Sequence, residues 1–349
     1  MQASINGAQP LGFDNSEVLG ISNEIQANQE ELLSKPNVVG VSYGRKVIEH
    51  EGGRDTGEPA LKVLVRQKLP PEMLSPQEMV ESTYGSAQTD LVAVGDLFAG
   101  DLQMTRRPTG PTWPPGARWP TETRLEAPDG NPVAPSEALL TALRPGLLDG
   151  RRTLQELETD IQLLRTRVRP AEGGYSVGHF RITTGTIATC VYDTAAFPGI
   201  PQRYYILSNN HVLANSNNAN IGDPILQPGP FDGGTLPNDV IARLSRWVTI
   251  WFDGSNNLVD AAIVGGPFEW LDREIYWIGY AQGVRNNWPA IGEILQKTGR
   301  TTNWTTGPVV AINATVNVNY GGGQVARFAG QIVTGNMSAG ATRAAWSWT

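Results

Sequence analysis

The second half of the chain is a succession of short apolar and β-branched runs separated by turn residues. It includes "HFRITTGTIATCVYD", "QRYYILSNNHVL" and "GPVVAINATVNVNY", with further runs of the same kind between them. Short strands at such regular spacing are typical of a β-barrel or a β-sandwich. The 39 glycines and 25 prolines agree with this interpretation, because both residues favour turns over long helices. We therefore expect a mainly-β domain over residues 173–349.

The first hundred residues predict a different arrangement. Apolar side chains in residues 15–33 recur at helical spacing, and Pro36 ends the pattern. The segments "NVVGVSYGRKVIEH" and "PALKVLVRQKL" alternate like strands on either side of a glycine-rich turn. A short helix near residues 75–83 and one more strand near 89–98 are expected to follow. The sequence thus predicts a small α+β domain over residues 1–105.

Residues 106–172 are expected to connect these two domains. The first half of this segment is rich in proline and is typical of a linker or of an extended segment on a surface. Its second half, "RTLQELETDIQLLRTRV", predicts one amphipathic helix. The apolar stripe of that helix consists of Leu154, Leu157, Ile161, Leu164 and Val168. We expect the stripe to pack on the neighbouring domain; a self-associating coiled coil is the alternative, but two heptads fall short of the usual three or four.

Composition and charge narrow the function classes. A formal charge of −7 and a pI near 5.1, with arginines scattered along the chain, predict no nucleic-acid partner. No apolar run is long enough to span a bilayer, so we expect no membrane partner either. The first twenty residues lack a basic segment followed by an apolar one, which predicts a cytoplasmic protein without a signal peptide. No pattern indicates an oligomeric state.

Cysteine and histidine usage bears on disulfides and metals. The single cysteine, Cys190, cannot form an internal disulfide, so packing must hold the fold together. Its neighbours predict a strand, and free cysteines are commonly buried, so we expect a structural thiol. One cysteine and three dispersed histidines do not form a ligand cluster at a known spacing. We therefore expect neither a metal nor another cofactor.

The three histidines differ in their surroundings. His50 lies between two glutamates and is expected on the surface, and His179 opens a strand with no identifiable partner. His211 follows an apolar strand in "YYILSNNHVLAN", and Asp260 lies within the apolar strand "LVDAAIVGG". An ionised carboxylate in such a strand is costly unless a donor pairs with it, and a histidine nitrogen is one such donor. An aspartate that orients a histidine is two thirds of the machinery that activates a serine hydroxyl.

Three motifs in this order, "LSNNHVLAN", "VDAAIV" and "KTGRTT", resemble the trypsin-like, chymotrypsin-fold serine peptidases. The resemblance is to a bacterial branch that carries an "NVVGV" amino-terminal domain, and it covers that domain and residues 177–340. It implies a double β-barrel, a protein or peptide substrate and serine endopeptidase activity. It also implies that His211 is the general base and that Asp260 fixes the tautomer of that histidine. The family further requires a "GDSG" loop, which supplies the nucleophilic serine and part of the oxyanion hole.

The expected loop is replaced by "MSAGATRAAWSWT". Back-translated codons, read again from the third base of Gly340, can encode "GDSGSLVVD" in the required place. We therefore expect a one-base frame break after Gly340, with Arg343 standing where the nucleophile would be. The second barrel would then be incomplete and the chain as printed inactive. Ser338 and Ser347 are nearby hydroxyls, but neither lies in a GDSG-like loop.

Two alternatives to an active peptidase stay open. A pseudopeptidase could bind an extended peptide along a strand edge without cleaving it. The N-terminal domain and the linker helix could instead have a structural or assembly role.

Overall fold

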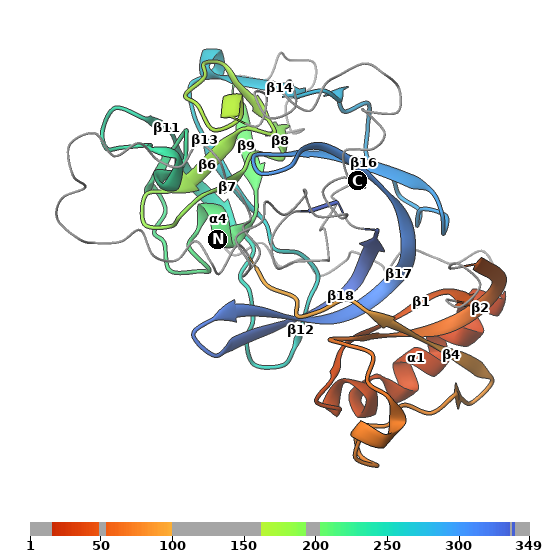
Figure 1. The fold of residues 1–349 in the computed structure, drawn as a ribbon. Coiled ribbons are helices and arrows are strands. Elements are labelled where there is room, and N and C mark those ends of the chain that lie inside the picture. The colour runs from red at the N-terminus through yellow and green to blue at the C-terminus, as the bar shows by residue number, and fades with distance from the viewer. Residues whose placement is uncertain (1–15, 49–53, 100–161, 193–202, 336, 339–349) are drawn as a thin grey trace, which may run out of the picture.

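The computed structural model describes residues 16–48, 54–99, 162–192, 203–335 and 337–338. These residues form a mainly-β protein with a helix-strand region at its N-terminal end and a strongly curled sheet beside a smaller barrel (Figure 1). Among them no helix is both long enough and apolar enough to cross a membrane.

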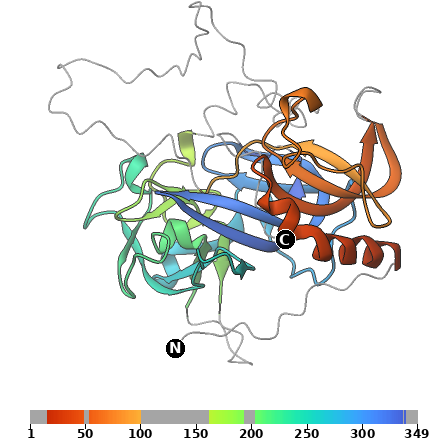
Figure 2. The ribbon, with the colours of Figure 1, turned by 90° about the horizontal axis from the view of Figure 1, so that it is seen from below.

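The N-terminal region begins with the expected amphipathic helix, α1 (Ser16–Ser34). Two antiparallel strands follow, β1 (Val38–Ile48) and β2 (Arg54–Val65), and β4 (Ala87–Ala93) runs parallel to β2. The buried face of α1 packs on this sheet, where Ile25 and Leu32 belong to one apolar cluster with side chains of β1 and β2 (Figure 2). This burial explains why the helical spacing predicted from the sequence is realised.

The prediction of a short helix near residues 75–83 is wrong. The structure has a 3₁₀ turn, η2 (Pro71–Met73), then turns, and then β3 (Thr83–Tyr84). The Glu78 carboxylate accepts hydrogen bonds from both the backbone N–H and the hydroxyl of Ser75, at 3.0 and 2.8 Å. This is the side-chain half of a capping box, but the turn at residues 76–78 does not continue as a helix, and the chain has no regular structure until β3 begins at Thr83.

A barrel forms the core of the second half of the chain. Its sheet has the order β7-β6-β10-β11-β13-β9-β8. The strands are β6 (Ser176–His179), β7 (Gly185–Thr186), β8 (Thr189–Val191), β9 (Tyr205–Ser208), β10 (Pro224–Leu226), β11 (Val240–Trp247) and β13 (Ala262–Gly265).

The two ends of this sheet meet, because β7 and β8 are parts of one extended segment. Ile187 donates its N–H to the carbonyl of Tyr175 beside β6, at 2.9 Å, and Ala188 donates to the carbonyl of Leu207 in β9, at 3.0 Å. Two neighbouring residues of this segment thus bond to opposite sides of the sheet, one beside β6 and the other in β9. These bonds close the barrel. Leu164 and Ala171 are fully buried in its core, so the core includes residues that the sequence assigns to the linker.

The linker helix is only partly within the described residues. Leu154, Leu157 and Ile161 lie outside them, and the chain leaves the helical conformation at Leu164. Leu164 and Val168 nevertheless both pack on the barrel core, as the first interpretation of the apolar stripe expects.

The second sheet combines both ends of the chain. Its order is β12-β18-β17-β1-β2-β4-β3, and β16 also pairs with β17. The new strands are β12 (Asn256–Asn257), β16 (Ile294–Gly299), β17 (Asn303–Gly321) and β18 (Gln324–Thr334). β17 and β18 form a curled hairpin (Figure 1), and a separate small sheet contains β5 (Ala171–Gly173), β14 (Leu271–Ile275) and β15 (Gly279–Tyr280).

One edge of β17 is covered by two different segments in turn. Its first part pairs with β16, where Gly299 lies opposite Asn303, and a later part pairs with β1, where Gly44 lies opposite Ala311. β18 occupies the opposite edge. The sheet therefore continues across the predicted limits at residues 105 and 173, and the N-terminal region pairs with an edge of β17 that would otherwise be open.

Cys190 is buried in β8, as expected. Burial raises the pKa of its thiol to about 12, so the reactive thiolate is scarce near neutral pH. We predict that iodoacetamide leaves the folded protein unmodified at about pH 8 and alkylates it fully in urea. Because the chain has one cysteine, the intact mass reports this thiol alone. Alkylation of the folded protein at the rate of the unfolded one would contradict the buried position.

A buried ion pair joins the barrel to the curled sheet. Arg300, in the turn between β16 and β17, lies 2.5 Å from the Asp232 carboxylate, and both side chains are 4% exposed. The other carboxylate oxygen accepts hydrogen bonds from the hydroxyls of Ser176 and Thr184 in the barrel. Asp232 thus bonds both to barrel residues and to the turn that leads into the curled sheet.

Replacing Asp232 by Asn should destabilise the protein by about 3–5 kcal/mol, because the Arg300 guanidinium would stay buried and lose the counter-charge of Asp232. Urea unfolding followed by tryptophan fluorescence measures this loss. Asp253→Asn is the control, since Asp253 is exposed and, within the described part of the chain, bonds to its neighbour Ser255. An equal loss in both variants would contradict the bridging role of Asp232.

Candidate active site

His211 lies on a one-turn helix directly after a barrel strand. β9 ends at Ser208, Asn209 keeps an extended conformation, and α4 (Asn210–Leu213) follows. Val212 and Leu213 are buried in the barrel core and anchor this turn. The side chain of His211 is 21% exposed, so it lies at the barrel surface.

Asp260 comes from the segment that leads into β13. The sequence placed this residue inside the strand, but the strand begins two residues later, at Ala262. Its side chain is 12% exposed. The side-chain amide of Asn209 donates to the backbone carbonyl of Asp260 at 3.0 Å, which ties the two segments together.

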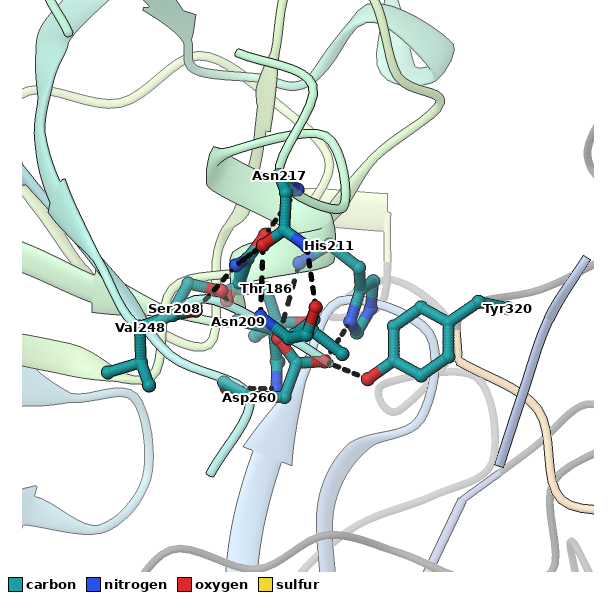
Figure 3. A network of polar contacts seen from close by, with 10 residues as sticks. Thr186, Ser208, Asn209, His211, Asn217, Val248, Asp260 and Tyr320 are labelled. Carbon is teal, nitrogen blue, oxygen red and sulfur yellow. Dashed lines mark hydrogen bonds and ion pairs between the residues drawn. The ribbon is translucent and has the colours of Figure 1, made fainter. Parts of the chain in front are cut away.

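The structure brings together the two residues that the sequence singled out (Figure 3). Nδ1 of His211 lies 2.5 Å from Oδ2 of Asp260. The backbone N–H of His211 donates to Oδ1 of the same carboxylate at 3.2 Å. One carboxylate therefore holds both the main chain and the ring of His211.

A third group bonds to this carboxylate. Tyr320, near the end of β17, donates its hydroxyl to Oδ2 of Asp260 at 2.8 Å. No sequence motif points to this residue, because 60 residues separate it from Asp260 and nothing around it signals the contact. Only the packing of the curled sheet against the barrel brings it there.

The environment of Asp260 keeps the carboxylate ionised. Burial raises its pKa, but the charge of His211 and the hydrogen bonds from His211 and Tyr320 more than offset this, and the pKa lies below its usual range. An ionised carboxylate can only accept, so Nδ1 of His211 must donate its proton to Asp260. The lone pair of the neutral ring is then on Nε2, the nitrogen that a general base uses.

Buried asparagines shape the loop that carries His211. Asn210 is fully buried, and its side-chain amide donates to Oδ1 of Asn217 at 2.8 Å and to the carbonyl of Val248 at 2.7 Å. Asn217, with a φ of 70°, donates in turn to the carbonyl of Ile250 at 2.8 Å. These bonds replace the regular pairing that a loop lacks, and they connect α4 to the segment after β11. The polar run "SNN" in the sequence is therefore the fixed base of the His211 turn.

The residues expected near the nucleophile are mostly outside the described part. Arg343 and Ser347 lie outside it, and Ser338 is the last residue described. The preceding residue, Met337, is fully buried, and its carbonyl accepts the hydroxyl of Thr305 at 2.9 Å. This bond anchors the chain against β17 just before the segment where the missing loop was expected.

The other two histidines are not part of this arrangement. His50 lies outside the described residues. The sequence identified no partner for His179, and the structure supplies two: its Nε2 lies 3.1 Å from Oδ2 of Asp223, and its Nδ1 accepts the N–H of Arg181 at 3.2 Å. Its side chain is fully buried, so this second His–Asp pair supports the barrel. Within the described ranges no cluster of His, Cys, Asp and Glu has the geometry of a metal site.

The stability of the protein should depend on pH through His179. Burial lowers its pKa below 6.5, and this outweighs the opposing effect of Asp223. As pH falls through about 6.5, the unfolded chain therefore binds a proton that the folded chain does not yet bind. Stability should be lost on acidification, by up to about 1.4 kcal/mol per pH unit between the two pKa values.

Urea unfolding of the wild type and of His179→Gln at about pH 7.5 and pH 5.5 measures this contribution. The wild type should lose more stability between the two conditions than the variant, which has no proton to bind at this position. Equal losses would mean that His179 does not contribute to the pH dependence.

No family model matches the chain, and no curated protein matches it either. Among solved structures, the chain is similar to Thermobifida fusca Protease A. The match has 15% sequence identity and a TM-score of 0.31, and it covers 50% of this chain and 74% of the other.

Proposed function

We propose that this chain is a serine-type endopeptidase whose general base is His211. The observation that carries the proposal is the bond of 2.5 Å between Nδ1 of His211 and the Asp260 carboxylate, with His211 at the surface and Asp260 nearly buried. The trypsin-like motifs around both residues agree with it. In this proposal Asp260 fixes the tautomer of His211 and stabilises the imidazolium that forms during the reaction.

The reaction requires two further parts. A serine hydroxyl must lose its proton to Nε2 of His211 while its oxygen attacks the scissile carbonyl of a protein or peptide substrate. Backbone N–H donors must bind the oxyanion that forms. We propose that both come from the "GDSG" loop in the other reading frame after Gly340, so the chain as printed is inactive.

The alternative is a pseudopeptidase that binds peptides without cleaving them. The sequence "ATRAAWSWT" favours it, because the printed chain has no nucleophile in the expected loop. Reading the gene across Gly340 separates the two: a frame that continues through "GDSG" favours the peptidase, and stop codons in both frames favour the binder.

The proposal predicts the labelling of active serine by a fluorophosphonate probe. The printed chain should show neither labelling nor casein hydrolysis, since loss of the nucleophile of a triad lowers kcat by about a millionfold. Restoring one base after Gly340, with the downstream coding sequence, should give a protein that is labelled and active. In that protein His211→Ala should abolish labelling, and Asp260→Asn should lower kcat by about ten-thousandfold.

His179→Gln in the restored protein is the matched control, because it disrupts the other His–Asp pair, whose histidine is fully buried, and should leave the label in place. Labelling of the printed chain would make Ser338 or Ser347 the candidate nucleophile. A restored protein that folds but stays unlabelled would refute the peptidase proposal.

A further inference from the structure

Tyr320 reaches the His211–Asp260 pair from the other half of the molecule. It lies one residue before the end of β17, next to a turn in which Gly321, Gly322 and Gly323 have φ values of 81°, 59° and 82°. Positive φ at three successive residues suits glycine, and the tight turn sends β18 back along β17. His211 and Asp260 belong to the barrel, so the hydroxyl of Tyr320 crosses from the curled sheet to the barrel (Figure 3).

The ring of Tyr320 is held by its aromatic neighbours. It packs edge to face on Phe252, with 5.3 Å between ring centroids, and stacks on Phe328 at 6.3 Å. Phe328 is almost fully buried in β18. The His211 ring also stands edge to face with Tyr320, at 6.0 Å. Packing on these sides fixes the direction of the hydroxyl, since a tyrosine has only two side-chain torsions to restrict.

The curled sheet also holds the segment that leads to Asp260. The Asn257 amide donates to the carbonyl of Arg327 at 3.0 Å, and the Gln331 amide donates to the carbonyl of Leu258 at 2.9 Å. Arg327 and Gln331 both belong to β18. The hairpin that carries Tyr320 thus fixes the main chain just before Asp260 as well as its carboxylate.

We propose that Tyr320 is a positioning residue for the candidate active site: it shares Oδ2 of Asp260 with Nδ1 of His211, and so sets both the place of the carboxylate and the strength of its bond to the His211 ring. Its importance for catalysis rests on the proposed peptidase function; its action on the pair does not. Oδ2 accepts from both Tyr320 and His211, whereas Oδ1 accepts the backbone N–H of His211. Three donors from two halves of the molecule therefore define one carboxylate position.

This arrangement makes the site depend on the assembly of the two halves. Among the described residues, the titratable groups that act on Asp260 are His211 and Tyr320. Burial and the Asp260 charge raise the pKa of Tyr320, so its hydroxyl keeps its proton and stays a donor at physiological pH. The Tyr320 hydroxyl can reach Asp260 only when the curled sheet packs against the barrel.

Proton NMR of the chain as printed tests the proposal without a nucleophile or a substrate. An imidazole N–H that donates to a carboxylate gives a resonance far downfield, and loss of the signal in His211→Asn assigns it. Tyr320→Phe removes a competing donor from Oδ2, which makes this oxygen a stronger acceptor, so the resonance should move further downfield. Incorporation of 3-fluorotyrosine at position 320 keeps the ring, strengthens the donor and should move the resonance upfield.

Tyr280→Phe is the matched control, because it removes an exposed tyrosine hydroxyl whose pKa is raised by another carboxylate, that of Asp272. It should leave the resonance unchanged. A resonance that does not respond to either change at Tyr320, or that moves in the same direction in both, would overturn the proposal. A restored protein without peptidase activity but with the expected shifts would refute only the proposed function.

Discussion

The carboxylate of Asp260 is the group on which the candidate site depends. A buried anion is costly, and the cost falls only when donors surround it. The chain supplies these donors from three places: the ring and the backbone N–H of His211 and the hydroxyl of Tyr320. These hydrogen bonds link three segments of the chain through one carboxylate. They hold α4, the segment before β13 and the end of β17 in one arrangement.

A second constraint is the pairing of strand edges. The long strand β17 would expose a row of backbone groups on one side after β16 ends, and β1 covers part of that row. The N-terminal region therefore contributes to the same sheet as the hairpin that carries Tyr320. Arg327 of β18 adds a further link to this region, through an ion pair with Glu30 of α1 at 2.6 Å.

The two His–Asp pairs show how similar contacts can have different consequences. His179 is fully buried, and its ring bonds on both sides, to the Arg181 N–H and to Asp223. His211 bonds to Asp260 through one nitrogen and is partly exposed. A general base needs a ring that a nucleophile can reach, so the surroundings of each ring, rather than the pairing alone, separate a structural pair from a candidate catalytic one.

Local patterns in the sequence determined the helix α1, the strand character of the second half and the burial of Cys190, because spacing and composition act over a few residues. They also indicated His211 and Asp260, since a carboxylate in an apolar run demands a partner. The partner of His179, the contact of Tyr320 and the continuation of the sheet from β17 into β1 were decided by tertiary structure alone. Each of these joins residues that are distant in the chain, and their proximity follows from how the barrel closes and the curled sheet packs, which no short stretch of sequence encodes.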